Sequence, residues 1–402
     1  MSAATLRRAK GERRAIASGF VCVLLALAAG TRAQSEVRDA RLDPRRPLLG
    51  YGTDAWRRSG REAMRGATLG PIESSLHPGV GYGTPASAAA LDELVALGCN
   101  WVSITPFGRI WDLRSTDIQL DFEATFRSNR AAIVRVIAQA HARGLSVLLI
   151  PHLWVETTGW RGEIDPGDDA RWTAWFASYT RFVTAWARVA EEAHAEMLSV
   201  GVEMKSSSQR HASQWFEVID TVRGLYRGLL TYSANWDEEP QVAFWDRLDV
   251  VGINAFYPLT EHAGADLDAL RLGAVARARH LEEWATREDR IVMFTEFGYT
   301  ARPDPALRPW EWPDSMVGVR VDEHAQAIAT RALLEAFVGR PWFAGAFVWR
   351  YYANPMDASQ EPAWGFSPRG REAEDALREI YAVRWGADAD AFPPASGVGF
   401  FP

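Results

Sequence analysis

Hydrophobic positions alternate between two patterns along the chain from Arg65 to about residue 385. Short apolar and β-branched runs predict buried strands, and longer segments with apolar residues every three or four positions predict helices. The eight predicted strands are residues 65–70, 100–105, 146–150, 198–202, 229–232, 250–254, 291–295 and 344–348. The first of them has the weakest pattern, because it is short and a glycine-containing loop follows it.

The segments between these strands carry helix boundaries and helical stripes. Thr84-Pro85 predicts the start of a helix that stops at Gly98, and another predicted helix ends at Gly144. A third presents an aromatic stripe from Trp175 to Trp186, and later helices are expected at 265–285, 323–338 and 371–381. Eight strands alternating with seven or eight helices favour an α/β fold, a closed (β/α)8 TIM barrel, over an open doubly wound sheet.

The chain ends predict an exported protein with one folded domain. Basic residues precede an apolar stretch at 15–29, and Thr31-Arg32-Ala33 offers a cleavage site, so residues 1–33 are expected to be a signal peptide. A retained membrane anchor is the alternative, but the stretch is shorter than the roughly 20 residues that span a bilayer. We expect an N-terminal extension at 34–64, a single-domain barrel at 65–386 and a tail at 387–402. Two loop insertions are expected, one at 50–64 before the first strand and one at 302–317.

Charge and cysteine content narrow the possible partners. The chain has a net charge of −7, and removing a leader with six Lys or Arg and one Glu leaves about −12. Such an acidic protein is a poor candidate for binding nucleic acid. The sequence after the leader has no second long apolar run, so we expect no association with a membrane after cleavage. Cys99 is then the single cysteine, so no internal disulfide is expected. We expect a secreted or periplasmic monomer with no cofactor and no metal.

Chemically useful side chains follow several predicted strands. In a barrel of this kind the carboxyl ends of the strands meet at one rim, where reactive residues collect. The residues at these strand ends are His152, Glu203, Asn235, Trp236, Asn254, Tyr257, Glu296 and Trp349. We therefore expect them to surround one site.

Glu203 and Glu296 follow the fourth and seventh strands, where two carboxylates can face each other. Hydrolysis of a glycosidic bond with retention needs two carboxyl groups about 5 Å apart, whereas inversion needs roughly 6.5–9.5 Å. The alternative is that each is an ordinary rim carboxylate paired with an arginine. Finding both at these two strands together favours the catalytic interpretation.

Several ordered segments resemble glycoside hydrolase family 113. They are Gly201-Val-Glu-Met, Ser233-Ala-Asn-Trp-Asp, Gly252-Ile-Asn-Ala-Phe-Tyr-Pro-Leu and Thr295-Glu-Phe-Gly-Tyr. The resemblance runs from about Arg65 to Trp385 and implies a β-1,4-mannanase of the (β/α)8 clan, acting on mannan, glucomannan or manno-oligosaccharides. Another activity of that clan, or a carbohydrate-binding barrel without catalysis, is the alternative.

The resemblance also implies separate roles. Glu203 would be the acid/base and Glu296 the nucleophile, and Tyr257 resembles an aromatic hydroxyl that orients the nucleophile. Many clan members carry Asn directly before the acid/base, but this chain has Val202. The missing contact to the sugar is either absent or supplied by Asn235 or Asn254, each of which can instead cap a turn.

Four further residues are candidates for contacts with the sugar. Lys205 is the one lysine after the leader, and we expect it to point away from Glu203, because a nearby ammonium would lower the pKa of a general acid. A chance remnant of a lysine-poor composition is the alternative. His152 can bind substrate or serve as a satisfied rim histidine. Trp236 and Trp349 are expected to be sugar platforms, with core packing as the alternative.

Overall fold

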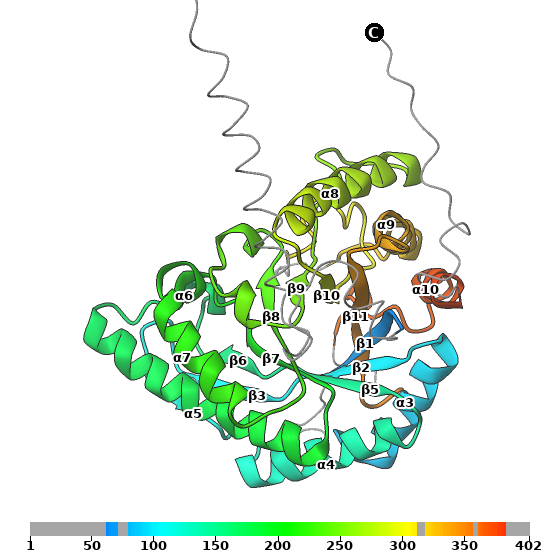
Figure 1. Ribbon diagram of the computed structural model, residues 1–402. Coiled ribbons are helices and arrows are strands. Elements are labelled where there is room, and N and C mark those ends of the chain that lie inside the picture. Colours follow the sequence, from blue (N-terminus) through cyan, green and yellow to red (C-terminus); the bar gives the residue numbers. More distant parts are fainter. Residues whose placement is uncertain (1–61, 71–78, 312–317, 357–360, 383–402) are drawn as a thin grey trace, which may run out of the picture. The chain divides into compact units, whose positions relative to one another are not determined.

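The computed structural model describes residues 62–70, 79–311, 318–356 and 361–382. Its main sheet is a closed parallel barrel in the order β1-β11-β10-β9-β8-β7-β5-β2 (Figure 1). These strands are β1 (Met64–Gly70), β2 (Trp101–Ile104), β5 (Ser146–Leu149), β7 (Met197–Val202), β8 (Leu229–Asn235), β9 (Val251–Asn254), β10 (Val292–Phe297) and β11 (Phe343–Tyr352). The predicted TIM barrel is confirmed. Its weakest predicted strand, β1, closes the ring by pairing with both β2 and β11.

The helices surround this barrel. They are α3 (Pro85–Leu97), α4 (Phe126–His141), α5 (Asp169–Ala193), α6 (Lys205–Arg210), α7 (Ala212–Arg223), α8 (Leu267–Arg287), α9 (Glu323–Phe337) and α10 (Glu372–Ala382). The predicted boundaries of α3 are confirmed: the Thr84 side chain accepts from the Ser87 N–H, and Gly98 ends the helix at a φ of 98°. None of the helices in the described ranges has the length and apolar content for crossing a membrane.

One connection in the described chain departs from the regular βα repeat. Between β8 and β9 lie only two short 3-10 turns, Glu239–Gln241 and Trp245–Arg247, where a barrel helix is usual. Phe244 and Trp245 in this connection are buried and cover the outside of the sheet next to Trp215 of α7. Aromatic side chains thus fill the space that a helix would occupy.

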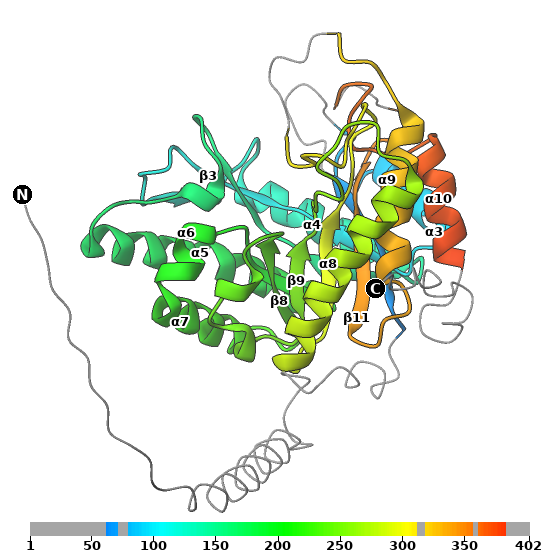
Figure 2. The same cartoon turned by 90° about the horizontal axis from the view of Figure 1, so that it is seen from above.

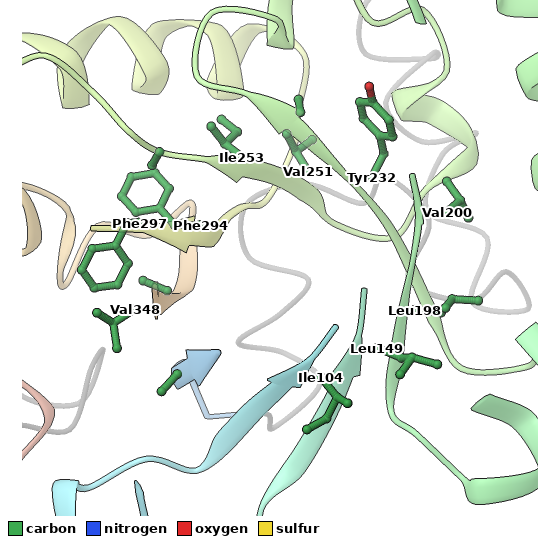
Figure 3. Close-up of a cluster of buried hydrophobic side chains, with 14 of the residues drawn as sticks. Ile104, Leu149, Leu198, Val200, Tyr232, Val251, Ile253, Phe294, Phe297 and Val348 are labelled. Carbon is green, nitrogen blue, oxygen red and sulfur yellow. The ribbon is translucent and has the colours of Figure 1, made fainter. Parts of the chain in front are cut away.

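The core has two layers because strand side chains alternate between the two faces of the sheet. The inner layer fills the barrel with residues from the strands, including Trp101, Leu148, Val202, Met293 and Phe347. The outer layer lies between the strands and the helices, and Figure 3 shows part of it, from Ile104 and Leu149 round to Phe294. The predicted stripe of α5 lies in this outer layer.

A small sheet, which the sequence analysis did not predict, extends the barrel rim. Its strands are β3 (Phe107–Ile110), β4 (Ile118–Gln119) and β6 (His152–Val155), in the order β4-β3-β6. Pro106 separates β2 from β3 and Pro151 separates β5 from β6, yet the two chains stay paired across this break, with the His152 N–H donating to Pro106 O at 2.8 Å. The pair runs on past the barrel (Figure 2) and carries His152 to the rim.

The predicted leader, nearly all of the N-terminal extension and the C-terminal tail lie outside the described residues, as does part of each predicted insertion. Asp168 caps the start of α5, because its side chain accepts a hydrogen bond from the Arg171 N–H.

Candidate active site

Glu203 lies directly after β7 in a backbone conformation that is uncommon for a residue with a side chain. Its φ is 51°, in the left-handed region, which costs on the order of 1–3 kcal/mol unless the surroundings stabilise it. Its N–H donates to Ser233 O at 2.8 Å. The Trp160 indole N–H donates to Oε2 at 2.9 Å, and the Asn254 amide donates to Oε1 at 3.0 Å. Both carboxylate oxygens are therefore oriented by donors from other strands and loops.

Glu296 lies within β10 and is 4% exposed. The Nε2 atom of His152 is 3.2 Å from Glu296 Oε1. Burial lowers the pKa of His152 well below its ordinary value, and the charges of Arg161 and Arg350 lower it further. The imidazole beside Glu296 is consequently neutral at neutral pH.

Asn254, the last residue of β9, connects the two carboxylates. It pairs with Glu296 in the register between β9 and β10, while its amide nitrogen donates to Glu203. Its amide oxygen accepts from Thr295 Oγ1 at 2.9 Å, which determines which way the amide points. The two glutamates predicted from separate strands therefore lie around one shared amide group.

The charge on Glu296 is set by opposing influences. Burial raises its pKa well above the ordinary value, and the negative charge of Glu203 raises it further. The charges of Arg161 and Arg350 and a hydrogen bond from Asn254 act in the opposite direction. Neither arginine has a carboxylate within ion-pair distance in the described structure, so both remain able to stabilise the ionised form of Glu296.

The two predicted tryptophan platforms occupy different sides of the site. Trp349 stacks on His152, with ring centroids 6.0 Å apart and an interplanar angle of 11°. Trp236 stacks on Trp310 at 5.1 Å, and Trp310 is 46% exposed. Both rings are only partly buried, as a surface that contacts sugar requires.

Tyr257 does not take the place that the resemblance implied. It is 4% exposed, and its ring packs against Phe294 and Phe337 in the layer between β10 and α9. No hydrogen bond joins it to Glu296 in the described structure. The residue follows β9 by three positions, outside any strand period, so the sequence pattern does not indicate which face of the sheet its side chain takes.

Asn235 and Lys205 meet at a third carboxylate. The Asn235 amide donates to Asp237 Oδ1 and the Lys205 ammonium to Asp237 Oδ2, both at 2.7 Å. Asn235 therefore stabilises the turn after β8, whereas Asn254 is the asparagine whose amide reaches Glu203. Lys205 is paired with Asp237, and among the described residues it forms no ion pair with Glu203.

Three residues at the site were not among the predicted strand-end residues: Trp160, Arg161 and Arg350. Trp160 and Arg161 follow β6, at the start of a single 3-10 turn (Arg161–Glu163) that is too short to give the sequence a helix period. Each arginine directly follows a tryptophan of the site: Arg161 follows Trp160, and Arg350 follows Trp349. The repeated Trp-Arg pair is the signal that could have indicated them.

Known proteins resemble this chain in sequence and in fold. The model of glycoside hydrolase family 113 matches residues 77–364. A family 113 β-mannanase from Alicyclobacillus acidocaldarius has a TM-score of 0.68 at 28% identity, over 80% of this chain and 98% of that one. A structure described as a family 113 β-1,4-mannanase gives 0.68 at 25% identity, over 81% and 100%. A family 5 mannosidase from Rhizomucor miehei, at 10% identity and a TM-score of 0.57 over 80% and 93%, shares the fold. No curated protein sequence matches the chain.

Proposed function

The chain belongs to glycoside hydrolase family 113, and from that premise we propose that it is a retaining endo-β-1,4-mannanase acting on mannan, glucomannan or manno-oligosaccharides. The observation that carries the proposal is the arrangement of Glu203 and Glu296 around Asn254. A structural carboxylate at a rim is usually paired with a cation. Neither of these two has an ion pair with Arg or Lys within the described ranges.

The first step forms a covalent glycosyl-enzyme. The Glu296 carboxylate attacks the anomeric carbon while the bond to the leaving oxygen breaks, and Glu203 gives that oxygen its proton. Glu296 must be ionised for this step, which Arg161 and Arg350 favour. Glu203 must carry the proton, and its position at the less buried side of the pair leaves it accessible to the leaving group.

The second step releases the sugar. Glu203, now ionised, takes a proton from water, the water oxygen attacks the anomeric carbon, and the bond to Glu296 breaks. Two displacements on opposite faces restore the original configuration. The Asn254 amide lies beside both carboxylates, where a hydroxyl of the bound sugar would also lie. It can therefore supply the sugar contact that an asparagine directly before the acid/base makes in many clan members, where this chain has Val202.

Exposed tryptophans on both sides of the site support cleavage within a chain. Trp154 of β6 is 50% exposed and Trp111, just after β3, is 64% exposed, while Trp310 lies beside Trp236. Flat indole faces suit the apolar C–H patches of pyranose rings. Platforms at separate places along the rim favour a substrate of several sugar units.

A substrate panel tests this function. Reducing ends released from mannan, glucomannan, cellulose and xylan should be highest for mannan or glucomannan, and proton NMR should show the β-anomer as the first product from manno-oligosaccharides. Mixed oligosaccharides early in the reaction indicate endo action, whereas mannose alone indicates an exo-mannosidase. No release from any of the four polysaccharides would leave a carbohydrate-binding barrel as the interpretation.

Removing one arginine charge should shift the pH profile. In Arg161→Gln the pKa of Glu296 is expected to rise, because a charge that stabilises its ionised form is gone. The acidic limb of kcat/KM should therefore move to higher pH, since the nucleophile ionises later. Arg287→Gln, which removes a 65%-exposed charge from α8, is the control and should leave the limb in place. An unchanged or lowered limb in Arg161→Gln contradicts the role.

We also propose export to the periplasm or outside the cell, on the basis of residues 1–33 alone. Expression of the full chain in a bacterial host followed by N-terminal sequencing should yield a mature chain beginning near Gln34. Recovery of the intact N-terminus from the membrane fraction would favour the anchor.

A further inference from the structure

A fully buried carboxylate lies behind Glu203, in the turn after β8. Glu238 is 0% exposed and has no positively charged partner in the described structure. Instead, Tyr232 Oη donates to its Oε1 at 2.6 Å, Ser208 Oγ donates to the same oxygen, and the Asn235 N–H donates to Oε2 at 2.8 Å. A carboxylate withdrawn from water is costly, so its three donors need to be in place together.

Tyr232 connects this carboxylate to the candidate acid/base. Its hydroxyl oxygen accepts from the Met204 N–H at 2.8 Å while its proton is donated to Glu238. Met204 is the residue directly after Glu203. The Tyr232 ring is buried against Trp215 and Phe244, so the hydroxyl has little freedom to move.

Two backbone hydrogen bonds therefore flank the strained residue. On one side the Glu203 N–H donates to Ser233 O, and on the other the Met204 N–H donates to Tyr232 Oη. Both acceptors belong to β8. The second bond depends on Glu238, because its Oε1 accepts the tyrosine proton and so leaves the hydroxyl oxygen free to accept from Met204.

The segment after Glu203 is also attached to the same turn at two other points. Ser208 of α6 donates to Glu238, and Lys205 donates to the neighbouring Asp237. The pKa of Glu238 is raised to about 7: burial is the main cause, the hydrogen bonds from Ser208, Tyr232 and Asn235 oppose it, and the charge of Glu203 adds to it. Tyr232, Ser208 and Asp237 therefore attach the segment after Glu203 to this turn.

We propose that Glu238 is a positioning residue for the acid/base: through Tyr232 and Ser208 it holds the 203–208 segment so that Glu203 stays in its left-handed conformation, with its carboxylate between Trp160 and Asn254. This inference rests on the proposed function. It assigns Glu238 no contact with substrate.

Adjacent Glu239 provides a matched control. It is also buried, at 4% exposed, and burial likewise raises its pKa to about 7. Its carboxylate lies 4.0 Å from the exposed His280, and among the described residues it has no hydrogen bond to the 203–208 segment. Replacing either residue by glutamine therefore removes a buried carboxylate from this turn. Of the two, Glu238 alone has hydrogen bonds that lead to the segment after Glu203.

The experiment compares kcat/KM on two aryl β-mannobiosides in Tyr232→Phe, Glu238→Gln and Glu239→Gln. This constant reports the first chemical step, in which a phenol leaving group needs a proton and 2,4-dinitrophenolate does not. General acid catalysis contributes about 10²–10⁴-fold. Misplacing Glu203 in Tyr232→Phe and Glu238→Gln should therefore lower kcat/KM about tenfold or more for the phenyl substrate, with about twofold change or less for the dinitrophenyl one.

Glu239→Gln should leave both constants close to wild type. Equal losses on the two substrates in Glu238→Gln, or behaviour identical to Glu239→Gln, would overturn the positioning role. Circular dichroism and Tm identify a variant that fails to fold, and Tyr232→Phe, which removes a single oxygen, then carries the test. A wild-type protein inactive on both mannobiosides and on all polysaccharides defeats the proposed function itself, which separates the two failures.

Discussion

Glu296→Ala is expected to lower kcat/KM on manno-oligosaccharides by at least about 10⁴-fold, because no other described side chain can form the glycosyl-enzyme. Sodium azide should restore turnover by entering the space left by the carboxylate. It would attack the anomeric carbon from the face opposite the leaving group, so the product should be the α-mannosyl azide. The measurement is rate and product configuration with an aryl β-mannobioside.

The same variant should remain folded, for a reason visible in the site. Burial raises the pKa of Glu296 above its unfolded value, so ionising this group costs stability as pH rises from the unfolded pKa through the folded one. Alanine has no such cost. At neutral pH its Tm should equal or exceed that of wild type, a trade of stability for activity.

Glu239→Ala is a suitable control for Glu296→Ala, because it removes another buried carboxylate of raised pKa while retaining the catalytic pair. Activity of Glu296→Ala within tenfold of wild type would exclude the nucleophile role. Formation of the β-mannosyl azide by this variant would assign it the acid/base role instead.

Glu203→Ala is expected to show a loss that depends on the leaving group. On mannan kcat/KM should fall about 10²–10⁴-fold, the range supplied by general acid catalysis. On the 2,4-dinitrophenyl β-mannobioside the loss should be far smaller, because that leaving group departs without a proton. The measurement is kcat/KM on both substrates.

Azide should act on Glu203→Ala through the second step. The anion replaces water in attacking the glycosyl-enzyme, which needs no general base, and the product is the β-mannosyl azide. Asn254→Ala provides a comparison, because it removes a donor to Glu203 while leaving both carboxylates. An α-mannosyl azide from Glu203→Ala would reverse the two roles.

The configuration of the azide products is needed because burial by itself would assign Glu296 the role of the protonated acid rather than of the nucleophile. Burial raises the pKa of Glu296, which favours the protonated form of the proposed nucleophile. The charges of Arg161 and Arg350 counter this effect by stabilising the ionised form. The configuration of the azide product reports the role of each residue without reference to either pKa.

Much of the fold was predictable because its signals are local. All eight barrel strands were predicted with boundaries that differ from the observed ones by no more than four residues, and Thr84 and Gly98 bound α3 as expected. Strand ends were therefore located well enough to place Glu203 and Glu296 at one rim. The connection from β8 to β9 differs from the usual repeat because buried aromatic side chains occupy the position of a helix.

The site was predictable only where a strand carries the residue. Strand period and the parallel arrangement together direct Glu203, Glu296 and Asn254 to one place, and the sequence alone determines this much. Tyr257 lies three residues beyond the end of β9, where the strand alternation no longer predicts the direction of a side chain, and its ring packs in the outer layer of the core. The strands β3 and β6 were not predicted either, because each has only four residues, too few for a clear period, and directly follows a proline.

Tertiary structure alone decided what surrounds each carboxylate. Trp160 and Arg161 reach the pair from a segment more than 40 residues before Glu203, and Tyr232 joins Glu238 to Met204, which lies 28 residues before the tyrosine. Such contacts depend on how loops fold back over the rim, and their free energy comes from burial and hydrogen bonds between segments distant in sequence. The sequence determined where the two glutamates stand, and the packing around them decided how each is held and charged.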